Sequence, residues 1–514
     1  MRSNYYYHLV LVLGILLVSC ANSPQIAPQT PLGNSADSVP TDEQVGTPTQ
    51  IISPTRKPNP SPSPSPDASP LVPSPTPQKM PPRFTQYRLD ATLNYGEHQL
   101  SVEQQIAFTN RYAEPLSDLI LIVEPARYPG TFILEEIAWK DGQPVEDFSR
   151  EIGLIHIPLA PELEPGGTIA LLISYTLNLP SPSPSYYGRP IPFGYSNRQT
   201  NLVDWYPFIP PYRTGHGWVV NQPGAFGEHL VYEVADFEVN LQIIDDNPSL
   251  VIAASAPGIL EDGWWQYLLG SARNFSLSVS DQYLLSTTTV DSVLVMSYYF
   301  PLDTHAGESV LQTTAEALAL YNELFGPYTR QTLTVVEADF MDGMEYEGIY
   351  FLSKGFYNLY SGTASDYLTA IAAHETSHQW WYGAVGNDQA IEPWLDEALS
   401  TYSEKLYYEY LHPESLDWWW TYRINYYNPQ GWVDSTIYNP LGYRAYRDAV
   451  YLNGAKFLDD LSILIGNRAF LSFLKDYVSQ FSLQISTGDD FFDLLQNHTQ
   501  ENIQSLLDRY FENH

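Results

Sequence analysis

Two histidines and a glutamate in the segment His374-Glu375-Thr376-Ser377-His378 are spaced for metal chemistry. Histidines four residues apart lie on one helical face about one turn from each other, so both imidazoles can bind one tetrahedral Zn²⁺. Glu375 follows the first histidine, where its carboxylate can face the open coordination position and act on a water there. The alternative is a helix that carries two incidental surface histidines.

A carboxylate further along the chain, Glu397, is the candidate third ligand. It follows His378 after 18 intervening residues (379–396), inside Trp394–Ser400, which is typical of a helix start. An antiparallel return of that helix would place Glu397 beside the histidine pair. Two imidazoles and one carboxylate leave the fourth zinc position for water, which a hydrolytic site requires and a structural site does not. We therefore predict one Zn²⁺ per chain, held by His374, His378 and Glu397.

The sequence around these ligands, HETSHQWWYGAVGND and PWLDEALSTYSEKLYYE, resembles the M1 family of zinc aminopeptidases in the gluzincin clan. The resemblance spans about Arg83 to the C-terminus and is densest from 340 to 460. It implies a thermolysin-like catalytic domain, a zinc cofactor and peptide substrates. Because the chain ends at His514, soon after the last motif, we do not expect the large helical C-terminal domain of many relatives.

The motif GMEY, which contains Gly343, Met344 and Glu345, is similar to the family's Gly-x-Met-Glu-Asn motif. The resemblance implies that Glu345 binds the free α-amino group of the substrate, with Gly343 and Met344 beside it. Physically, selection of a free N-terminus requires an anion at a fixed distance from the metal, because the anion pairs with the substrate ammonium. Glu347 is the alternative, and both glutamates can instead be solvated acids of an edge strand.

The segment VYLNGA at 450–455 is similar to the family's Tyr-x-x-Gly-Ala segment. The resemblance implies that Tyr451 stabilises the oxyanion, and a phenol donor acting with the metal suits that task. Tyr443 and Tyr446 are competitors, and packing is the default role in a chain with 39 tyrosines. We assign the catalytic roles to Glu375 and Tyr451.

Four positions depart from the family pattern. Tyr346 stands in place of asparagine and Asp342 where glycine is common, so we expect an altered amine-binding corner. Asp396 and Ala398 replace asparagine and glycine beside Glu397, and we expect these changes to tune the site rather than abolish it.

Three functions are compatible with these residues. The first is a zinc-dependent aminopeptidase that removes N-terminal residues from peptides by metal-activated water attack. The second is a zinc endopeptidase or another hydrolase with altered amine recognition. The third is a non-catalytic surface lipoprotein that binds peptides, against which the intact ligands and Glu375 argue. Side-chain preference, peptide length limits and oligomeric state are left open.

The elements that must position these residues fall into two parts. From 83 to 300, short strand-like runs bounded by Pro, Gly, Asn and Asp predict an all-β sandwich or saddle. From 301 to 514 the pattern predicts an α+β, mostly helical catalytic domain. The longer predicted helices are 308–325, 366–382, 394–411, 448–465, 468–481 and 489–498.

The N-terminal sequence indicates export. The apolar run Leu9–Val18 is too short to cross a hydrocarbon core of about 30 Å and fits a secretory signal. Leu17-Val18-Ser19-Cys20 resembles a bacterial lipobox, which implies acylation of Cys20; an ordinary signal peptide with an incidental cysteine is the alternative. We predict a lipoprotein signal peptide at 1–19 and a Pro/Ser-rich disordered tether at 20–82. We thus predict a lipid-anchored, extracytoplasmic protein of the bacterial cell envelope that meets the membrane only through its anchor.

Composition excludes several classes of protein. With 24 Lys+Arg against 59 Asp+Glu the formal net charge is −35, so the chain lacks the basic surface that nucleic acid requires. A hydrophobic fraction of 44% supports globular burial. Because Cys20 is the one cysteine, neither an intramolecular disulfide nor a cysteine-ligated metal cluster can form.

Overall fold

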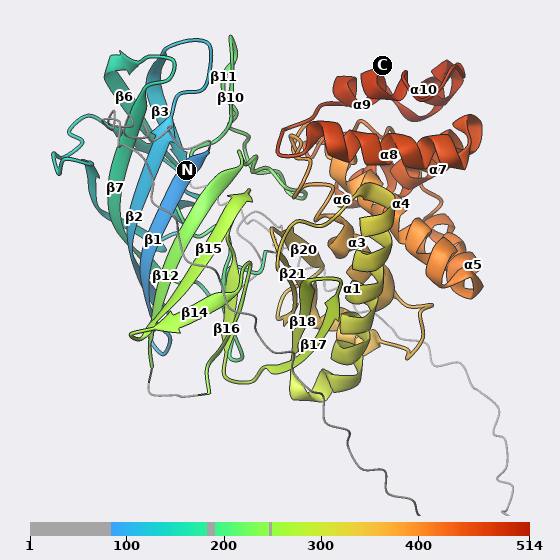
Figure 1. Ribbon diagram of the computed structural model, residues 1–514, viewed down its shortest axis with the longest axis horizontal. Coiled ribbons are helices and arrows are strands. Elements are labelled where there is room, and N and C mark those ends of the chain that lie inside the picture. Colours follow the sequence, from blue (N-terminus) through green and yellow to red (C-terminus); the bar gives the residue numbers. More distant parts are fainter. Residues whose placement is uncertain (1–83, 182–190, 246–248, 514) are drawn as a thin grey trace, which may run out of the picture. The chain divides into compact units, whose positions relative to one another are not determined.

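The computed structural model describes residues 84–181, 191–245 and 249–513 (Figure 1), all within one compact unit, Gln78–His514. The predicted signal peptide 1–19, the tether 20–82 and Cys20 lie outside the described residues. Within the described ranges, no helix has the length and apolar character needed to cross a membrane.

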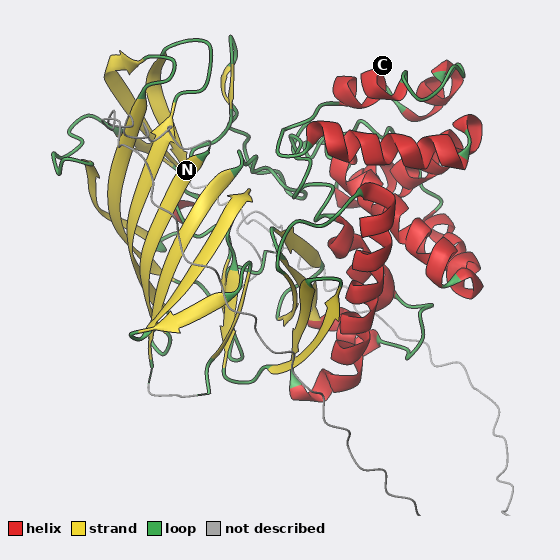
Figure 2. Cartoon of the chain, viewed as in Figure 1, coloured by secondary structure: helices red, strands yellow, loops and turns green. Residues whose placement is uncertain are grey.

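The first part of the described chain is built from strands, as its sequence pattern predicts (Figure 2). Every second residue of the strand Thr85–Asn94 is buried, so one face of its sheet carries the core. That sheet has the spatial order β14 (Gly258–Glu261), β15 (Trp264–Ala272), β12 (Ala235–Ile244), β1 (Thr85–Asn94), β2 (Gln99–Thr109), β7 (Thr168–Asn178) and β4 (Phe132–Trp139).

Three smaller sheets complete the β-rich part. One has the order β3 (Leu116–Ile122), β6 (Leu154–Leu163) and β5 (Ser149–Glu151). A second has the order β13 (Val251–Ala254), β16 (Leu277–Ser280), β9 (Thr200–Leu202) and β8 (Gly194–Tyr195). The third pairs β10 (Tyr212–Arg213) with β11 (Gly217–Trp218).

A five-stranded sheet begins the second part. Its order is β17 (Leu284–Val290), β18 (Val293–Tyr299), β19 (Thr332–Ala338), β21 (Ile349–Ser353) and β20 (Gly343–Tyr346). It takes strands from both sides of residue 300, and a domain boundary at that residue stays a prediction. β20 is last in the order and, among the described residues, pairs only with β21, so its other edge can receive an extended peptide.

The remaining chain is mostly helical. The α-helices are α1 (Thr304–Phe325), α2 (Lys354–Leu359), α3 (Tyr367–Ser377), α4 (Trp394–Leu411), α5 (Leu416–Trp418), α6 (Tyr443–Arg447), α7 (Gly454–Ile465), α8 (Asn467–Phe481), α9 (Gly488–Leu495) and α10 (Gln504–Tyr510). Short 3₁₀ or π turns are η1 (Glu124–Arg127), η2 (Pro301–Asp303), η3 (Pro413–Ser415), η4 (Trp419–Ile424), η5 (Asn425–Tyr427) and η6 (Asp448–Asn453). Residues 368–377 of α3 are all buried, so α3 is covered on every face.

Four predicted helices were wrong at one end. The helix predicted over 308–325 begins four residues earlier, at Thr304, and the helix predicted over 489–498 ends three residues earlier, at Leu495. The helix predicted over 366–382 ends at Ser377, and the φ of 124° at Tyr382 excludes a helix that reaches that residue. The backbone N–H of Gly383 instead donates to the carbonyl of His378 at 2.9 Å. The helix predicted over 448–465 begins as the π-helical turn η6, which hydrophobic spacing does not separate from an α-helix.

A buried arginine of the β-rich part holds the turn that follows α3. The Arg273 guanidinium donates to the carbonyl oxygens of Tyr232 (3.0 Å), Gly383 (3.1 Å) and Gln484 (2.8 Å). Buried carbonyl groups need such partners, and here one side chain serves several at once. Arg273 therefore fixes the C-terminal end of α3 against the β-rich part.

Candidate active site

The three predicted metal ligands converge at one point. His374 and His378 stand at the C-terminal end of α3, and Glu397 lies in the first turn of α4. Nε2 of His374 is 3.2 Å and Nε2 of His378 is 3.6 Å from the same Oε2 of Glu397. All three side chains are buried, and their ligand atoms lie within 4.8 Å of one another. The predicted convergence is confirmed.

Hydrogen bonds behind the imidazoles turn both Nε2 atoms toward this point. Nδ1 of His378 donates to the carbonyl oxygen of Trp381 at 2.9 Å, and Nδ1 of His374 donates to Oε1 of Glu404 at 2.9 Å. With Nδ1 protonated, each Nε2 presents its lone pair. Burial lowers the pKa of His378, so its imidazole is neutral, as a metal ligand must be.

Glu404 is itself held by a buried network. Arg423 donates to its two carboxylate oxygens at 2.9 and 2.7 Å, and the indole of Trp419 donates at 2.8 Å. Burial alone would raise the pKa of Glu404, but the charge of Arg423 and the hydrogen bond from His374 outweigh it, so the pKa is lowered. The carboxylate therefore stays charged and fixes the orientation of His374.

The donor set fits Zn²⁺. Two imidazole nitrogens and one carboxylate oxygen, all buried, are the ligands of catalytic zinc sites that keep one position open. The acids at this point are also closely spaced and buried. Burial and the neighbouring Asp396 raise the pKa of Glu397, and burial raises the pKa of Glu375. A divalent cation bound here would stabilise the charged forms of these acids.

Glu375 packs directly on the backbone of β20. A Cβ atom at Gly343 would lie 2.1 Å from Oε1 of Glu375, so a larger residue here would displace the Glu375 carboxylate. The other carboxylate oxygen, Oε2, is buried and accepts no hydrogen bond from the described residues. Glu375 thus lies against Gly343 and has one oxygen free to accept a proton.

A cavity of about 520 Å³ opens onto these residues, and Tyr451 lines it. The Tyr451 hydroxyl donates to Oε1 of Glu397, and burial together with the charge of Glu397 raises its pKa, so the phenol keeps its proton. Of the two competitors, Tyr446 is fully buried in the core, and Tyr443 donates to Asp342 at 3.3 Å. The structure therefore places Tyr451 beside a metal ligand, as its predicted role requires.

Glu345 lines the same cavity from β20, together with Met344. Its side chain is 5% exposed, and Gln389 donates to its Oε1 at 3.2 Å. Burial, followed by the charges of Glu228 and Glu397, raises the pKa of Glu345. A cationic group at this position would pair with the charged form of this buried carboxyl group.

The alternative amine binder, Glu347, serves the fold instead. It pairs with Arg330 at 2.7 Å and accepts the backbone N–H of Arg273 at 3.2 Å, and it does not line the cavity. The side chain of Tyr346 does not line the cavity either; its hydroxyl lies 3.5 Å from Asp204. The Tyr346 departure thus affects the packing behind Glu345 rather than the cavity wall.

Sequence analysis missed Glu228 and assigned no role to Glu404. Glu228 lines the cavity from the long connection between β11 and β12, where no motif marks it. Glu404, in contrast, follows Glu397 by seven residues, or about two helical turns, so the two share one face of α4. That spacing is a signal that could have identified Glu404.

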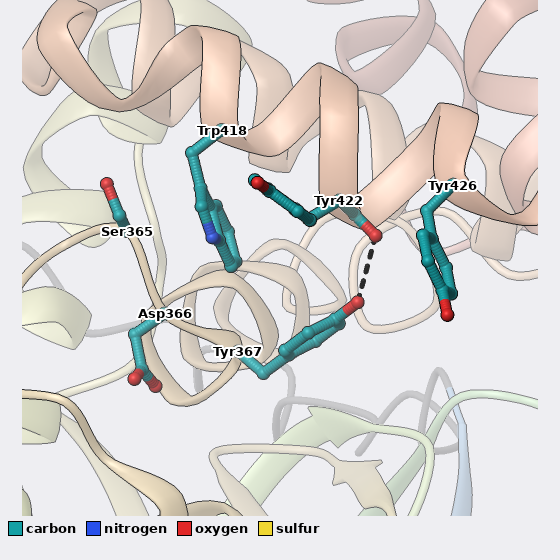
Figure 3. Close-up of a pocket in the computed structure, with 6 residues that line it drawn as sticks. All are labelled: Ser365, Asp366, Tyr367, Trp418, Tyr422 and Tyr426. Carbon is teal, nitrogen blue, oxygen red and sulfur yellow. Dashed lines mark hydrogen bonds between the residues drawn. The ribbon is translucent and has the colours of Figure 1, made fainter. Parts of the chain in front are cut away.

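A second cavity, of about 350 Å³, lies at the opposite end of α3 (Figure 3). Trp418, Tyr422 and Tyr426 line it opposite Tyr367, whose hydroxyl donates to the carbonyl oxygen of Tyr422 at 2.9 Å. Asp366, the carboxylate that lines this second cavity, is the N-cap of α3 and accepts the backbone N–H of Leu368. These residues anchor the start of the helix that carries the histidines.

Comparisons with known proteins agree with this geometry. Residues 309–510 match the family model described as the Peptidase family M1 domain. Human endoplasmic reticulum aminopeptidase 1 is 25% identical over 266 residues, which are 49% of this chain and 28% of that protein. Human endoplasmic reticulum aminopeptidase 2 is 26% identical over 259 residues, 47% of this chain and 27% of that protein. The chain thus spans less than a third of the length of these relatives.

Solved structures show the same fold. A mutant of the M1 zinc metallopeptidase from Deinococcus radiodurans, bound to a Tyr-Ser-Ala substrate, has a TM-score of 0.58 and 18% identity, with 84% of this chain and 94% of that chain covered. A two-domain M1 zinc metallopeptidase mutant bound to L-arginine has a TM-score of 0.59 and 20% identity, with coverages of 84% and 95%. This likeness confirms the predicted fold class, a β domain followed by a mostly helical catalytic region.

Replacing Glu404 with glutamine should weaken Zn²⁺ binding by about 10- to 100-fold, because the carboxylate behind a ligating histidine is lost. Competition with a chelator on the purified protein measures this affinity, and circular dichroism checks the fold, since Arg423 loses its anionic partner. Asp417→Asn, an exposed acid on α5, is the matched control. Equal zinc affinity of Glu404→Gln and wild type would contradict the role of Glu404.

Proposed function

We propose that this chain is a zinc-dependent aminopeptidase of the M1 type, which hydrolyses N-terminal residues from peptides. The observation that carries the proposal is one cavity that joins the His374–His378–Glu397 centre to a buried carboxyl group, Glu345. The match of residues 309–510 to the M1 domain model and the aminopeptidase relatives support it. Bound Zn²⁺ would polarise the substrate carbonyl and lower the pKa of a water molecule.

Glu375 is placed to move the proton in this reaction. Its buried Oε2 has no other partner among the described residues, and its Oε1 is packed on β20. It accepts the proton of the attacking water and passes it to the leaving amine. Tyr451 keeps its phenolic proton and donates to the carbonyl oxygen as negative charge develops there.

Glu345 and Glu228 account for the selection of a free N-terminus. Both line the cavity, and the charge of Glu228 adds to the burial that raises the pKa of Glu345. A substrate ammonium supplies the missing countercharge through charge-assisted hydrogen bonds. An N-acetylated substrate carries no such charge and leaves the buried Glu345 carboxyl group without a cationic partner, which disfavours its binding.

Glu375→Gln should lower kcat by about 10²–10⁴-fold, the usual contribution of a positioned general base. Zinc content should stay at the wild-type level, because Glu375 is not a ligand. Aminoacyl fluorogenic amides and metal analysis measure the two quantities. Unchanged activity on every tested peptide would contradict the proposed chemistry, and the non-catalytic peptide-binding lipoprotein would then be the better account.

A free aminoacyl amide should be hydrolysed and its N-acetylated form should not. Glu345→Gln should lower kcat/KM for the free substrate by about tenfold or more, because a hydrogen bond to a charged group is lost. Steady-state kinetics on matched substrates tests both statements. Equal turnover of the free and acetylated substrates would favour the zinc endopeptidase.

We also propose that the chain is exported and lipid-anchored in the bacterial cell envelope, with peptides as its substrates and nucleic acid excluded by its charge. Leu17-Val18-Ser19-Cys20 supports this, although it lies outside the described residues. Cys20→Ser should abolish incorporation of labelled palmitate and move the protein out of the membrane fraction. Labelling equal to that of the wild type would contradict the lipobox assignment.

A further inference from the structure

We infer that Asp342 selects substrates with a basic side chain at the residue that follows the scissile bond. This inference rests on the proposed aminopeptidase function and names its substrate class. It comes from the order of side chains along the free edge of β20, from the exposure of the Asp342 carboxylate and from the pairing of the neighbouring arginines.

The residues of β20 and its approach line up along the path of an extended peptide. Glu345 binds the substrate amine, and Gly343 touches Glu375, which marks the level of the attacked bond. Asp342 directly precedes Gly343 in the chain, so it lies on the side of Gly343 that faces away from Glu345. Strand residues advance about 3.3 Å each, so Asp342 lies about 10 Å from Glu345 along this path. The residue after the cleaved bond lies about one step beyond the residue that carries the amine, and the long stem of a basic side chain there spans the remaining distance to Asp342.

The Asp342 carboxylate is free to pair with a substrate cation. The residue is exposed and lines the cavity, and its oxygens accept only hydrogen bonds from neutral groups, the Gly343 N–H (3.1 Å) and the Tyr443 hydroxyl (3.3 Å). No ion pair to Asp342 occurs among the described residues. Arg423 and Arg447 line the same cavity and form their ion pairs with other carboxylates, while the charge of Asp342 also acts on Arg423 and raises its pKa.

The backbone of Asp342 supports a role for the side chain. Its φ of 90° lies in a region that residues other than glycine rarely adopt. Such strain is found at functional sites, and a glycine at this position would remove it. The chain instead places an acid there, one residue from the contact between Gly343 and Glu375.

The test compares the tripeptides Leu-Lys-Ala, Leu-Gln-Ala and Leu-Glu-Ala through the release of leucine by the full chain. Wild-type kcat/KM should decrease in that order, with a Lys-to-Glu ratio of about tenfold or more. Asp342→Asn tolerates the left-handed backbone and removes the charge, so the ratio should fall about three- to tenfold. In the wild type, added salt should also reduce the ratio.

Glu308→Gln is the matched control, because it removes one exposed carboxylate of α1 and should keep the wild-type ratio. An unchanged ratio in Asp342→Asn overturns the inference, even if all three rates fall together, as loss of a merely structural residue would cause. If the wild type releases leucine from all three peptides at equal rates, only the inference fails. If it releases leucine from none of them, the proposed function fails and the inference fails with it.

Discussion

The buried connection from Arg423 through Glu404 to His374 is the interaction on which the candidate site depends. Glu404 and Glu397 lie two turns apart on α4, so one helix supplies both a metal ligand and the group that orients another. A shift of α4 by one residue would rotate both carboxylates by about 100° away from α3. Arg423 lies outside α3 and α4 and binds Glu404 through two hydrogen bonds. These bonds hold α4 in the position along its axis that the site requires.

The site also requires that α3 stay in place beside β20, since Glu375 lies on Gly343. Two side chains at the junction with the β-rich part provide this. Glu347, immediately after β20, pairs with Arg330 and accepts the backbone N–H of Arg273. The Arg273 guanidinium binds the carbonyls of the turn after α3. The strand that borders the cavity and the helix that carries the ligands are therefore held by one connected network.

The parts of this site that the sequence predicts are those set by local spacing. The pattern of His374 and His378 depends on helical geometry alone, and the predicted helix 394–411 matches α4 at both ends. Features set by distant contacts were beyond such reasoning. The early end of α3 depends on Arg273, more than a hundred residues upstream, and Glu228 reaches the cavity from a connection without periodicity. The choice between Glu345 and Glu347 depends on Arg330, because both glutamates are buried.

Burial of several acids in one cavity costs free energy that the fold alone does not recover. Glu345, Glu375 and Glu397 are each 5% exposed or less, and burial raises the pKa of each. Glu404, a buried acid with a structural role, differs from these three. It pairs with Arg423, whose charge lowers the pKa of Glu404. The three cavity acids have no arginine ion pair among the described residues. Without a countercharge from outside the chain these carboxyl groups keep their protons, and a divalent cation together with the ammonium of the proposed substrate would stabilise their charged forms.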